Sequence, residues 1–219
     1  MAGADPQPTQ SAPIAELVRA AAALGLPLSD TATARFRIYI DTLLLWRRRL
    51  SLTTAATAAE IVRSHILDSL MLCQFIQPGM RVVDLGSGAG FPGIPLAIVC
   101  EQAHVSLVES RRKKANFLRE VVRTAGLANA EVLEERAEGL AARLAEPWDV
   151  VVSRAVWTMA DFLAVSECLL APQGMAIAMK GPKVAAEAVS YTGPLVHSDT
   201  VEYRLPTGAR HRLIVYRTV

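Results

Sequence analysis

One stretch, residues 82–93, constrains the fold more than any other part of the chain. It runs Val-Val-Asp-Leu-Gly-Ser-Gly-Ala-Gly-Phe-Pro-Gly, a short apolar run that ends in an acid and is followed by four closely spaced glycines. Glycine has no Cβ, so it adopts positive φ and lets another molecule approach the backbone, and Pro92 suits the first turn of a helix. The stretch therefore predicts a strand, a tight loop and a helix that together hold a nucleoside cofactor.

From Arg81 onward, short apolar runs alternate with stretches whose apolar residues recur at helical spacing. Such alternation is typical of a parallel β-sheet that helices cover on both faces. The chain ends in two strand-like segments around Pro206-Thr207-Gly208, which predicts an antiparallel hairpin. We therefore expect an α/β fold with a mostly parallel sheet. The expected strands are 81–85, 105–109, 130–133, 149–153 and 175–179, the hairpin strands are 195–205 and 211–217, and the expected helices are 92–100, 112–124, 137–144 and 159–170.

The N-terminal third of the chain differs from the rest, because helical patterns follow one another there without strands. Apolar residues recur at helical spacing from Ile14 to Leu24, potential N-caps at 29–31 precede a second helix that ends at Trp46, and Thr57 can cap a third that runs to Gln77. We therefore divide the 219 residues into a disordered N-terminus (1–13), a helical extension (14–78) and an α/β domain (79–219).

Composition excludes several classes of protein. No segment has the apolar core of a signal peptide or the roughly 18 apolar residues of a membrane span, so we expect a cytoplasmic protein without membrane contact. We also expect a monomer. Cys73, Cys100 and Cys168 are far apart in the sequence and lie in apolar surroundings, which predicts buried, reduced thiols. No metal-ligand spacing occurs. Net charge is only +2, and the basic clusters 47–49, 111–114 and 210–212 are expected to be solvated surfaces.

Two nucleoside cofactors compete for the glycine-rich loop. Residues 88–93 match the G-x-G-x-x-G pattern of dinucleotide-binding loops, which would make the protein an NAD(P)- or FAD-dependent oxidoreductase. However, 84–87 separate the apolar run from the first glycine of the pattern, and Pro92 and Pro95 remove backbone N–H groups that a pyrophosphate would need. S-adenosylmethionine carries no phosphate, and Asp84 can accept hydrogen bonds from its ammonium group.

Further residues at predicted strand ends fit a nucleoside. Glu109 ends the second strand about 20 residues beyond Gly90, where a carboxylate accepts the ribose hydroxyls of either cofactor. Ala137 and Glu138 follow the third strand, where an adenine amino group meets backbone and an acid. Arg154 closes the fourth strand at the edge where α/β sheets bind ligands, and it either forms a structural ion pair or faces substrate. Strand-end capping is the alternative role of Asp84 and Glu109.

The chemistry that the chain lacks narrows the methyl acceptor. Methyltransferases that act on exocyclic amines commonly carry an Asn/Asp-Pro-Pro-aromatic motif after the fourth strand, whereas this chain has Ser-Arg-Ala-Val at 153–156. No cysteine lies in a polar loop that would activate it as the nucleophile for C5 methylation of pyrimidines. A ring nitrogen such as guanine N7 already presents a lone pair and needs positioning only. Arginines suit recognition of the guanine edge, and the candidate cations are Arg136, Arg154, Lys180 and Arg210.

Taken together, these residues resemble the bacterial 16S ribosomal RNA guanine-N7 methyltransferases, a family also called glucose-inhibited division protein B or small-subunit rRNA methyltransferase G. The resemblance covers the chain from about Leu43 to the C-terminus. The segments that carry it are His-Ile-Leu-Asp-Ser at 65–69, the loop at 84–96, Ser-Arg-Ala at 153–155, Lys-Gly at 180–181 and Arg-His at 210–211.

The resemblance implies a Rossmann-like class I methyltransferase with an N-terminal helical extension. It implies transfer of a methyl group from S-adenosylmethionine to N7 of one guanine in 16S rRNA, presented by the small ribosomal subunit or its precursor. The expected cofactor residues are Asp84, Gly86, Ser87, Gly88, Gly90, Phe91, Glu109, Ala137, Glu138 and Arg154, and the residues expected to flank the guanine are Arg136, Arg154 and Arg210. A non-catalytic RNA-binding relative of the same fold is a further alternative.

Some residues of the helical extension depart from the family pattern or have two interpretations. Arg47 follows Trp46 where the family has asparagine, Ser-Leu-Thr at 51–53 replaces Asn-Leu-Thr, and Ser64 precedes His65 where arginine is common. His65 and Asp68 share a helix face. Without a third ligand nearby they suit a hydrogen-bond network or a pocket wall rather than a metal. Trp46 and Trp157 could stack on a base, although core packing is the expected role of Trp46.

Overall fold

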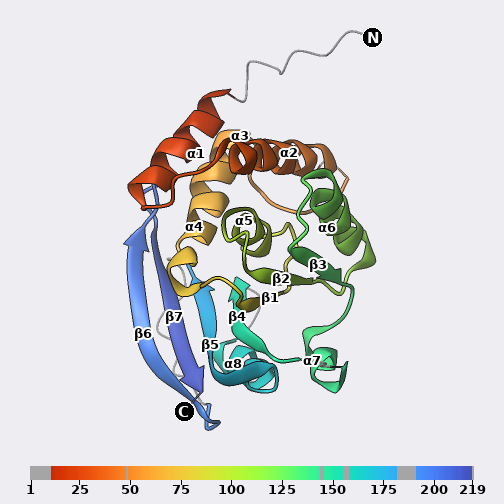
Figure 1. Cartoon of the computed structure of the whole chain (residues 1–219), viewed down its shortest axis with the longest axis vertical. Helices are drawn as coiled ribbons and strands as arrows, with labels where there is room; N and C mark the ends of the chain where they lie inside the picture. Colours follow the sequence, from red (N-terminus) through yellow and green to blue (C-terminus); the bar gives the residue numbers. More distant parts are fainter. Residues whose placement is uncertain (1–10, 48, 144–145, 155–157, 182–190, 219) are drawn as a thin grey trace.

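The computed structural model describes residues 11–47, 49–143, 146–154, 158–181 and 191–218, and these form one sheet with helices on both faces (Figure 1). The sheet has seven strands in the order β3-β2-β1-β4-β5-β7-β6. Strands β3 to β5 are parallel, whereas β7 runs antiparallel to β5 and to β6. The strands are β1 (Arg81–Leu85), β2 (His104–Val108), β3 (Ala130–Leu133), β4 (Trp148–Arg154), β5 (Leu170–Lys180), β6 (Leu195–Arg204) and β7 (Arg210–Thr218).

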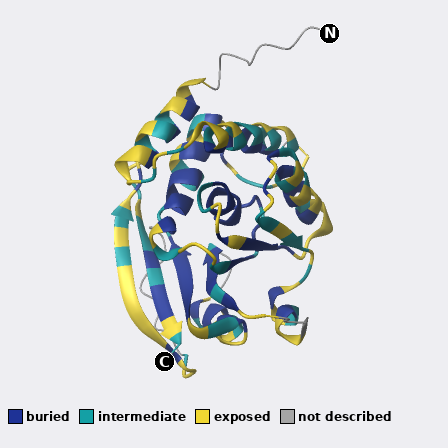
Figure 2. Cartoon of the chain, in the orientation of Figure 1, coloured by how far each residue is buried: buried dark blue, intermediate teal, exposed yellow. Residues whose placement is uncertain are grey.

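Side-chain alternation in the strands creates one core on each face of the sheet. In β1, Val82 packs in the cluster that contains α5 (Gly93–Val99) and α6 (Arg112–Thr124). Val83 and Leu85 point the other way and pack with the short α7 (Ala137–Leu140) and with α8 (Met159–Glu167). Figure 2 shows the central strands buried, while the edge strand β6 is largely exposed. The predicted α/β class, with a parallel sheet and a C-terminal antiparallel hairpin, is confirmed.

The N-terminal helices extend the core on the α5 and α6 face. They comprise α1 (Ser11–Ala23), α2 (Asp30–Trp46), α3 (Ala58–Ile61), a π-helical turn (Val62–Ile66), α4 (Leu67–Leu70) and a 3-10 turn (Cys73–Phe75). The hydroxyl of Ser29 caps α2, and Thr57 and Glu60 form a reciprocal capping box on α3, as the capping residues predicted. The third helix is not continuous, because the π-helical turn interrupts it. Such turns re-aim side chains and are frequent at functional sites, and this one carries His65.

Several expected boundaries are wrong. Helix α1 begins at Ser11 rather than Ile14, because Pro13 sits buried in its first turn, where a missing N–H costs nothing; residues 1–10 lie outside the described chain. Strand β5 begins at Leu170, inside the expected fourth helix of the α/β region, since its backbone pairs with Trp148 of β4. Helix α7 ends at Leu140 and gives way to a 3-10 turn.

The cysteines also differ from expectation. The Sγ atoms of Cys73 and Cys100 lie 3.7 Å apart, so two residues that are distant in sequence meet in the fold. Cys168 is exposed at the end of α8, where the expected burial is wrong. None of the described helices is long and apolar enough to span a membrane. Within the described ranges, no group of three or more His, Cys, Asp or Glu side chains is placed to hold a metal ion.

Candidate active site

The glycine-rich loop after β1 is held in a tight, fixed conformation. Gly86, Gly88 and Gly90 all have positive φ, at 75°, 56° and 94°. The N–H groups of Gly86 and Ser87 both donate to the carbonyl oxygen of Val108 at 2.9 Å, which ties the loop to the end of β2. A Cβ at Gly90 would lie 2.6 Å from Cγ1 of Ile94. Only glycine fits this position, for reasons of both space and backbone conformation.

A cavity of about 430 Å³ opens beside this loop, at the carboxyl ends of β1, β2 and β3. Glu109 lies at its base, and its carboxylate accepts hydrogen bonds from Gly88 N at 3.2 Å and from Arg111 N at 2.8 Å. A carboxylate has about four lone-pair sites, so it retains acceptor capacity for further hydroxyl groups. We call this space the cofactor cavity. Its lining includes five of the expected cofactor residues, Gly86, Gly88, Glu109, Ala137 and Glu138, together with Arg136 and Lys114.

Asp84 lies at the end of β1, fully buried below the start of α5. Its Oδ2 accepts a hydrogen bond from Gly93 N at 3.0 Å, whereas its Oδ1 has no hydrogen-bond partner among the described residues. Burial raises the pKa of Asp84 to about 6, against the lowering effect of the Gly93 N–H group. An unpartnered buried carboxylate oxygen is costly, so the site favours a ligand that brings a donor.

Arg154, at the end of β4, is the centre of a second cluster. Its Nη1 lies 3.1 Å from Nδ1 of His65 and 3.6 Å from Oδ2 of Asp68, and its Cζ lies 5.1 Å from the ring centroid of Phe91. Phe91 belongs to the glycine-rich loop and is buried, and the ring of His65 is 4.9 Å from it. We call these four residues the Arg154 cluster. It places a guanidinium, 23% exposed, against the aromatic end of the glycine-rich loop.

Two residues of the C-terminal hairpin hold Asp68. The hydroxyl of Tyr203 donates to Oδ1 of Asp68 at 2.6 Å, and Nδ1 of His211 lies 3.0 Å from the same oxygen. Asp68 is only 1% exposed, and a buried carboxylate needs such partners. The contacts join α4, β4 and the β6–β7 hairpin around the guanidinium of Arg154.

His65 is neutral at physiological pH in this cluster. Burial and the neighbouring Arg154 lower its pKa to about 4. Its Nε2 lies 2.8 Å from Thr53 Oγ1, and its Nδ1 lies 2.9 Å from the carbonyl oxygen of Ser64. Thr53 therefore contacts the cluster although the preceding Ser51 departs from the family pattern.

The expected site residues divide between the two sites. Arg136 begins α7 and lines the cofactor cavity, whereas Arg154 is the centre of its own cluster. Arg210 is exposed at the start of β7, where it pairs with Arg204 of β6, and its side chain forms no ion pair with a described carboxylate. Ser87 is buried and donates to the carbonyl oxygen of Asp84 at 3.0 Å. The three arginines expected around one base are thus not gathered in one place.

Sequence reasoning missed Tyr39, Tyr203 and His211. The hydroxyl of Tyr39 donates to the carbonyl oxygen of Ala89 at 2.7 Å, and its ring lies 5.4 Å from that of Phe91. A tyrosine among apolar residues of a helix is expected to pack in the core, so nothing in the local sequence indicates this contact. For His211 a signal exists, because alternation along a strand turns it inward when Arg210 faces solvent.

Comparison with solved structures defines the fold class. A methyltransferase from Aquifex aeolicus, described as dependent on S-adenosylmethionine, shares the fold with a TM-score of 0.55 over 73% of this chain and 93% of that chain, at 18% identity. The sheet order and the glycine-rich loop at the ends of β1 and β2 are those of this Rossmann-like fold.

The sequence then identifies the family. Residues 32–215 match the model of the family described as rRNA small subunit methyltransferase G. A relative with that name from Xylella fastidiosa is 41% identical over 81% of this chain and 83% of its own length. Another, from Geotalea uraniireducens, is 37% identical over 91% of this chain and 93% of its own length. The chain belongs to the rRNA small subunit methyltransferase G family. The expected resemblance is confirmed, and the oxidoreductase alternative is not supported.

Proposed function

We propose that this protein transfers a methyl group from S-adenosylmethionine to N7 of a guanine in 16S rRNA. The observation that carries the proposal is the Arg154 cluster, which sets a guanidinium and a buried aromatic ring directly beside the glycine-rich loop. Membership of a family of small-subunit rRNA methyltransferases supports RNA as the substrate. Such a substrate also supports the expected cytoplasmic location.

The residues around the cofactor cavity fit S-adenosylmethionine. The unpartnered Oδ1 of Asp84 suits an ammonium group, received directly or through a water molecule. Glu109 suits the ribose hydroxyls, and the backbone and side chain at Ala137 and Glu138 suit the adenine amino group. When bound, the cofactor supplies an electrophilic methyl group.

The chain's own residues would then position the base rather than activate it. N7 of guanine carries a free lone pair, so no proton has to be removed before attack. Arg154 orients the base by donating to O6, which leaves the N7 lone pair free. The described part of both sites offers no cysteine, consistent with a reaction that needs no covalent intermediate.

Charge balance gives Asp68 a role in this scheme. The methylated guanine is cationic, and an uncompensated guanidinium beside it would oppose the reaction. Asp68 lies 3.6 Å from Arg154 and reduces that repulsion, while neutral His65 adds no further positive charge. Tyr203 and His211 keep Asp68 in place.

The proposal is tested by methylation of small ribosomal subunits from cells that lack the modification. Digested rRNA is analysed by mass spectrometry for 7-methylguanosine. We expect one new 7-methylguanosine per 16S rRNA. Methyl incorporation into any other nucleoside would contradict the proposal.

The matched variant is Arg154→Ala. We expect it to bind S-adenosylhomocysteine within a few-fold of the wild type while methyl transfer falls at least a hundredfold. Equal loss of both would instead assign Arg154 to the cofactor.

A further inference from the structure

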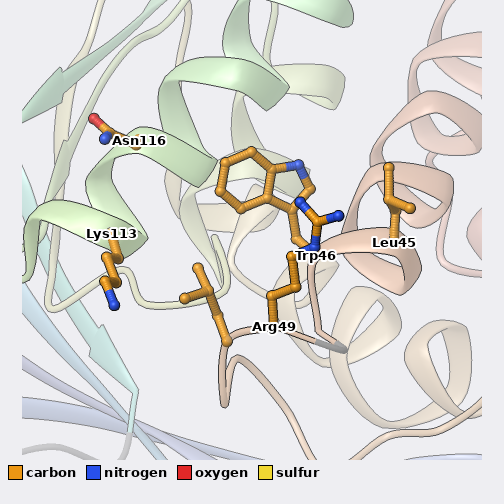
Figure 3. A pocket seen from close by; sticks show the side chains of 6 residues that line it. Leu45, Trp46, Arg49, Lys113 and Asn116 are labelled. Atoms are coloured by element: carbon orange, nitrogen blue, oxygen red, sulfur yellow. The ribbon is translucent and has the colours of Figure 1, made fainter.

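A second cavity, of about 400 Å³, lies between the end of α2 and the first half of α6. In Figure 3 the indole of Trp46 lies between the helix that carries Lys113 and Asn116 and the turn that carries Arg49. Leu45 and Leu50 complete the lining. We call this space the Trp46 cavity. It combines an apolar floor with two cations and an amide, whereas the lining of the cofactor cavity has both acidic and basic side chains.

One side of the Trp46 cavity is rigid and the other is accessible. The ring of Trp46 packs against Phe117 at a centroid distance of 5.9 Å, which fixes it to the core as its expected packing role requires. Trp46 is nevertheless only half-buried, and Leu45 is 66% exposed. An exposed leucine beside a partly buried indole offers apolar surface on which a flat ring can pack. The floor therefore suits a flat, partly apolar group.

The rim of the cavity carries uncompensated positive charge. Arg49 and Lys113 are exposed, and neither forms an ion pair with a described carboxylate. Among the described residues, no acidic side chain lines the cavity. An anion is therefore favoured at the rim, and a ring at the floor. A nucleotide of single-stranded RNA offers both groups.

The position of the cavity connects it to the active site from two directions. On α6, Lys113 and Asn116 line the Trp46 cavity, whereas Lys114 lines the cofactor cavity, so the first turns of this helix separate the two spaces. On the other side, the segment after α2 leads to the Arg154 cluster. Arg47 Nη1 donates to the carbonyl oxygen of Ala55 at 2.6 Å, and Thr53 contacts His65. An RNA strand that enters the active site can follow this segment.

We propose that the Trp46 cavity binds an unstacked nucleotide of the rRNA substrate, distinct from the guanine that is methylated. The base lies against Leu45, Trp46 and Leu50, and the phosphate lies between Arg49 and Lys113. This proposal rests on the proposed function, because it takes the RNA substrate as the ligand. A site of this kind adds affinity away from the reacting atoms, so it lowers KM for RNA and leaves kcat unchanged.

The first test removes the two rim cations. The double variant Arg49→Gln/Lys113→Gln is compared with Arg19→Gln/Arg123→Gln, which removes the same charge from exposed positions on α1 and at the far end of α6. Filter binding to unmodified 16S rRNA is measured from 0.05 to 0.2 M KCl. Each phosphate neutralised on a single strand contributes about 0.7 to the salt slope, so loss of this one phosphate should weaken binding roughly fivefold at 0.1 M and lower the slope by about 0.7.

A second variant tests the apolar floor. Leu45→Asn changes an exposed side chain and should leave folding intact, yet weaken binding several-fold with an unchanged salt slope. Binding of S-adenosylhomocysteine should stay within twofold of the wild type in every variant, which confirms an intact cofactor cavity.

The outcomes separate this proposal from the proposed function. If Arg49→Gln/Lys113→Gln binds 16S rRNA as well as the Arg19→Gln/Arg123→Gln control, the proposal is wrong, whichever nucleoside is methylated. Unchanged binding by Leu45→Asn would also overturn the base contact. If whole subunits bind less well while naked rRNA binds normally, a ribosomal protein occupies the cavity and the proposal fails. If the Arg49→Gln/Lys113→Gln variant selectively loses RNA binding but the wild-type protein forms no 7-methylguanosine, the RNA site is supported and the proposed function is refuted.

Discussion

Replacement of Asp68 by asparagine tests how the protein holds Arg154. Asparagine keeps the shape of the side chain but removes its charge. Hydrogen bonds to a charged group contribute about 1 kcal/mol more than neutral ones. Asp68 accepts one from Tyr203 at 2.6 Å, and Nδ1 of His211 lies 3.0 Å from the same oxygen. The pair with Arg154, at 3.6 Å and 23% exposed, adds less than about 1 kcal/mol after solvent screening. Asp68→Asn should therefore cost about 1 to 3 kcal/mol of unfolding free energy.

Tyr203→Phe is the matched variant, because it removes one hydrogen bond and leaves the charge of Asp68 in place. It should cost about 1 to 2 kcal/mol. Urea denaturation at pH 7 measures both, with equal m-values as the sign that the folded and denatured states are otherwise comparable. Steady-state methyl transfer with saturating cofactor gives the second readout. For Asp68→Asn we expect kcat to fall roughly tenfold, equivalent to about 1.4 kcal/mol in the barrier, because the charge of Arg154 is no longer balanced.

If Asp68→Asn is as stable as the wild type within about 0.5 kcal/mol, a difference near the error of such measurements, Asp68 does not hold Arg154 in this way. Asp68 is also not a positioning residue if Asp68→Asn loses affinity for S-adenosylhomocysteine as strongly as it loses kcat. That result would place Asp68 in the cofactor site rather than behind Arg154.

Three further predictions concern the cofactor side of the site. Burial raises the pKa of Asp84 from 3.8 to about 6, so its charged form is disfavoured in the folded state. The free energy of unfolding of the wild type should therefore fall by about 3 kcal/mol between pH 4 and 7. Urea denaturation at several pH values should show that this decrease is absent in Asp84→Asn. Glu109→Gln should weaken S-adenosylhomocysteine binding roughly tenfold in calorimetry, since a neutral amide accepts more weakly; an unchanged affinity would remove Glu109 from the site. Gly90→Ala should lower stability by about 1 to 3 kcal/mol, because φ is 94° and the new Cβ would approach Ile94 to 2.6 Å; unaltered thermal unfolding would contradict this.

Much of the fold can be predicted from local sequence patterns. Strand β1 and its loop were predictable because the strand, the acid and the glycines are adjacent in sequence and their conformations are set by near neighbours. Glu109 was predictable for a similar reason, since it ends the next strand, and parallel strands bring their carboxyl ends to one edge of the sheet. Boundaries were less predictable, because pairing between β4 and β5 decided where the strand at Leu170 begins.

The Arg154 cluster depended on contacts between distant segments. Arg210 was expected at the site on its charge, but the hairpin register pairs Tyr203 with His211 and turns these two side chains toward Asp68 instead. A shift of one residue would have exchanged them for their neighbours, and nothing in the hairpin sequence indicates a contact with Asp68, which lies 135 residues before Tyr203. The π-helical turn that aims His65 likewise cannot be read from its sequence.

The class of fold, the glycine-rich loop and the cofactor edge of the sheet therefore follow from local sequence, because short-range periodicity and glycine conformation specify them. Which cations lie near the active site depends instead on the tertiary structure. It placed Arg136 at the cofactor cavity and Arg154 in a separate cluster, left Arg210 exposed while the neighbouring His211 contacts Asp68, and opened the Trp46 cavity between α2 and α6. The physical reason is that strand register and helix packing join segments far apart in the chain, and these set the direction of each side chain.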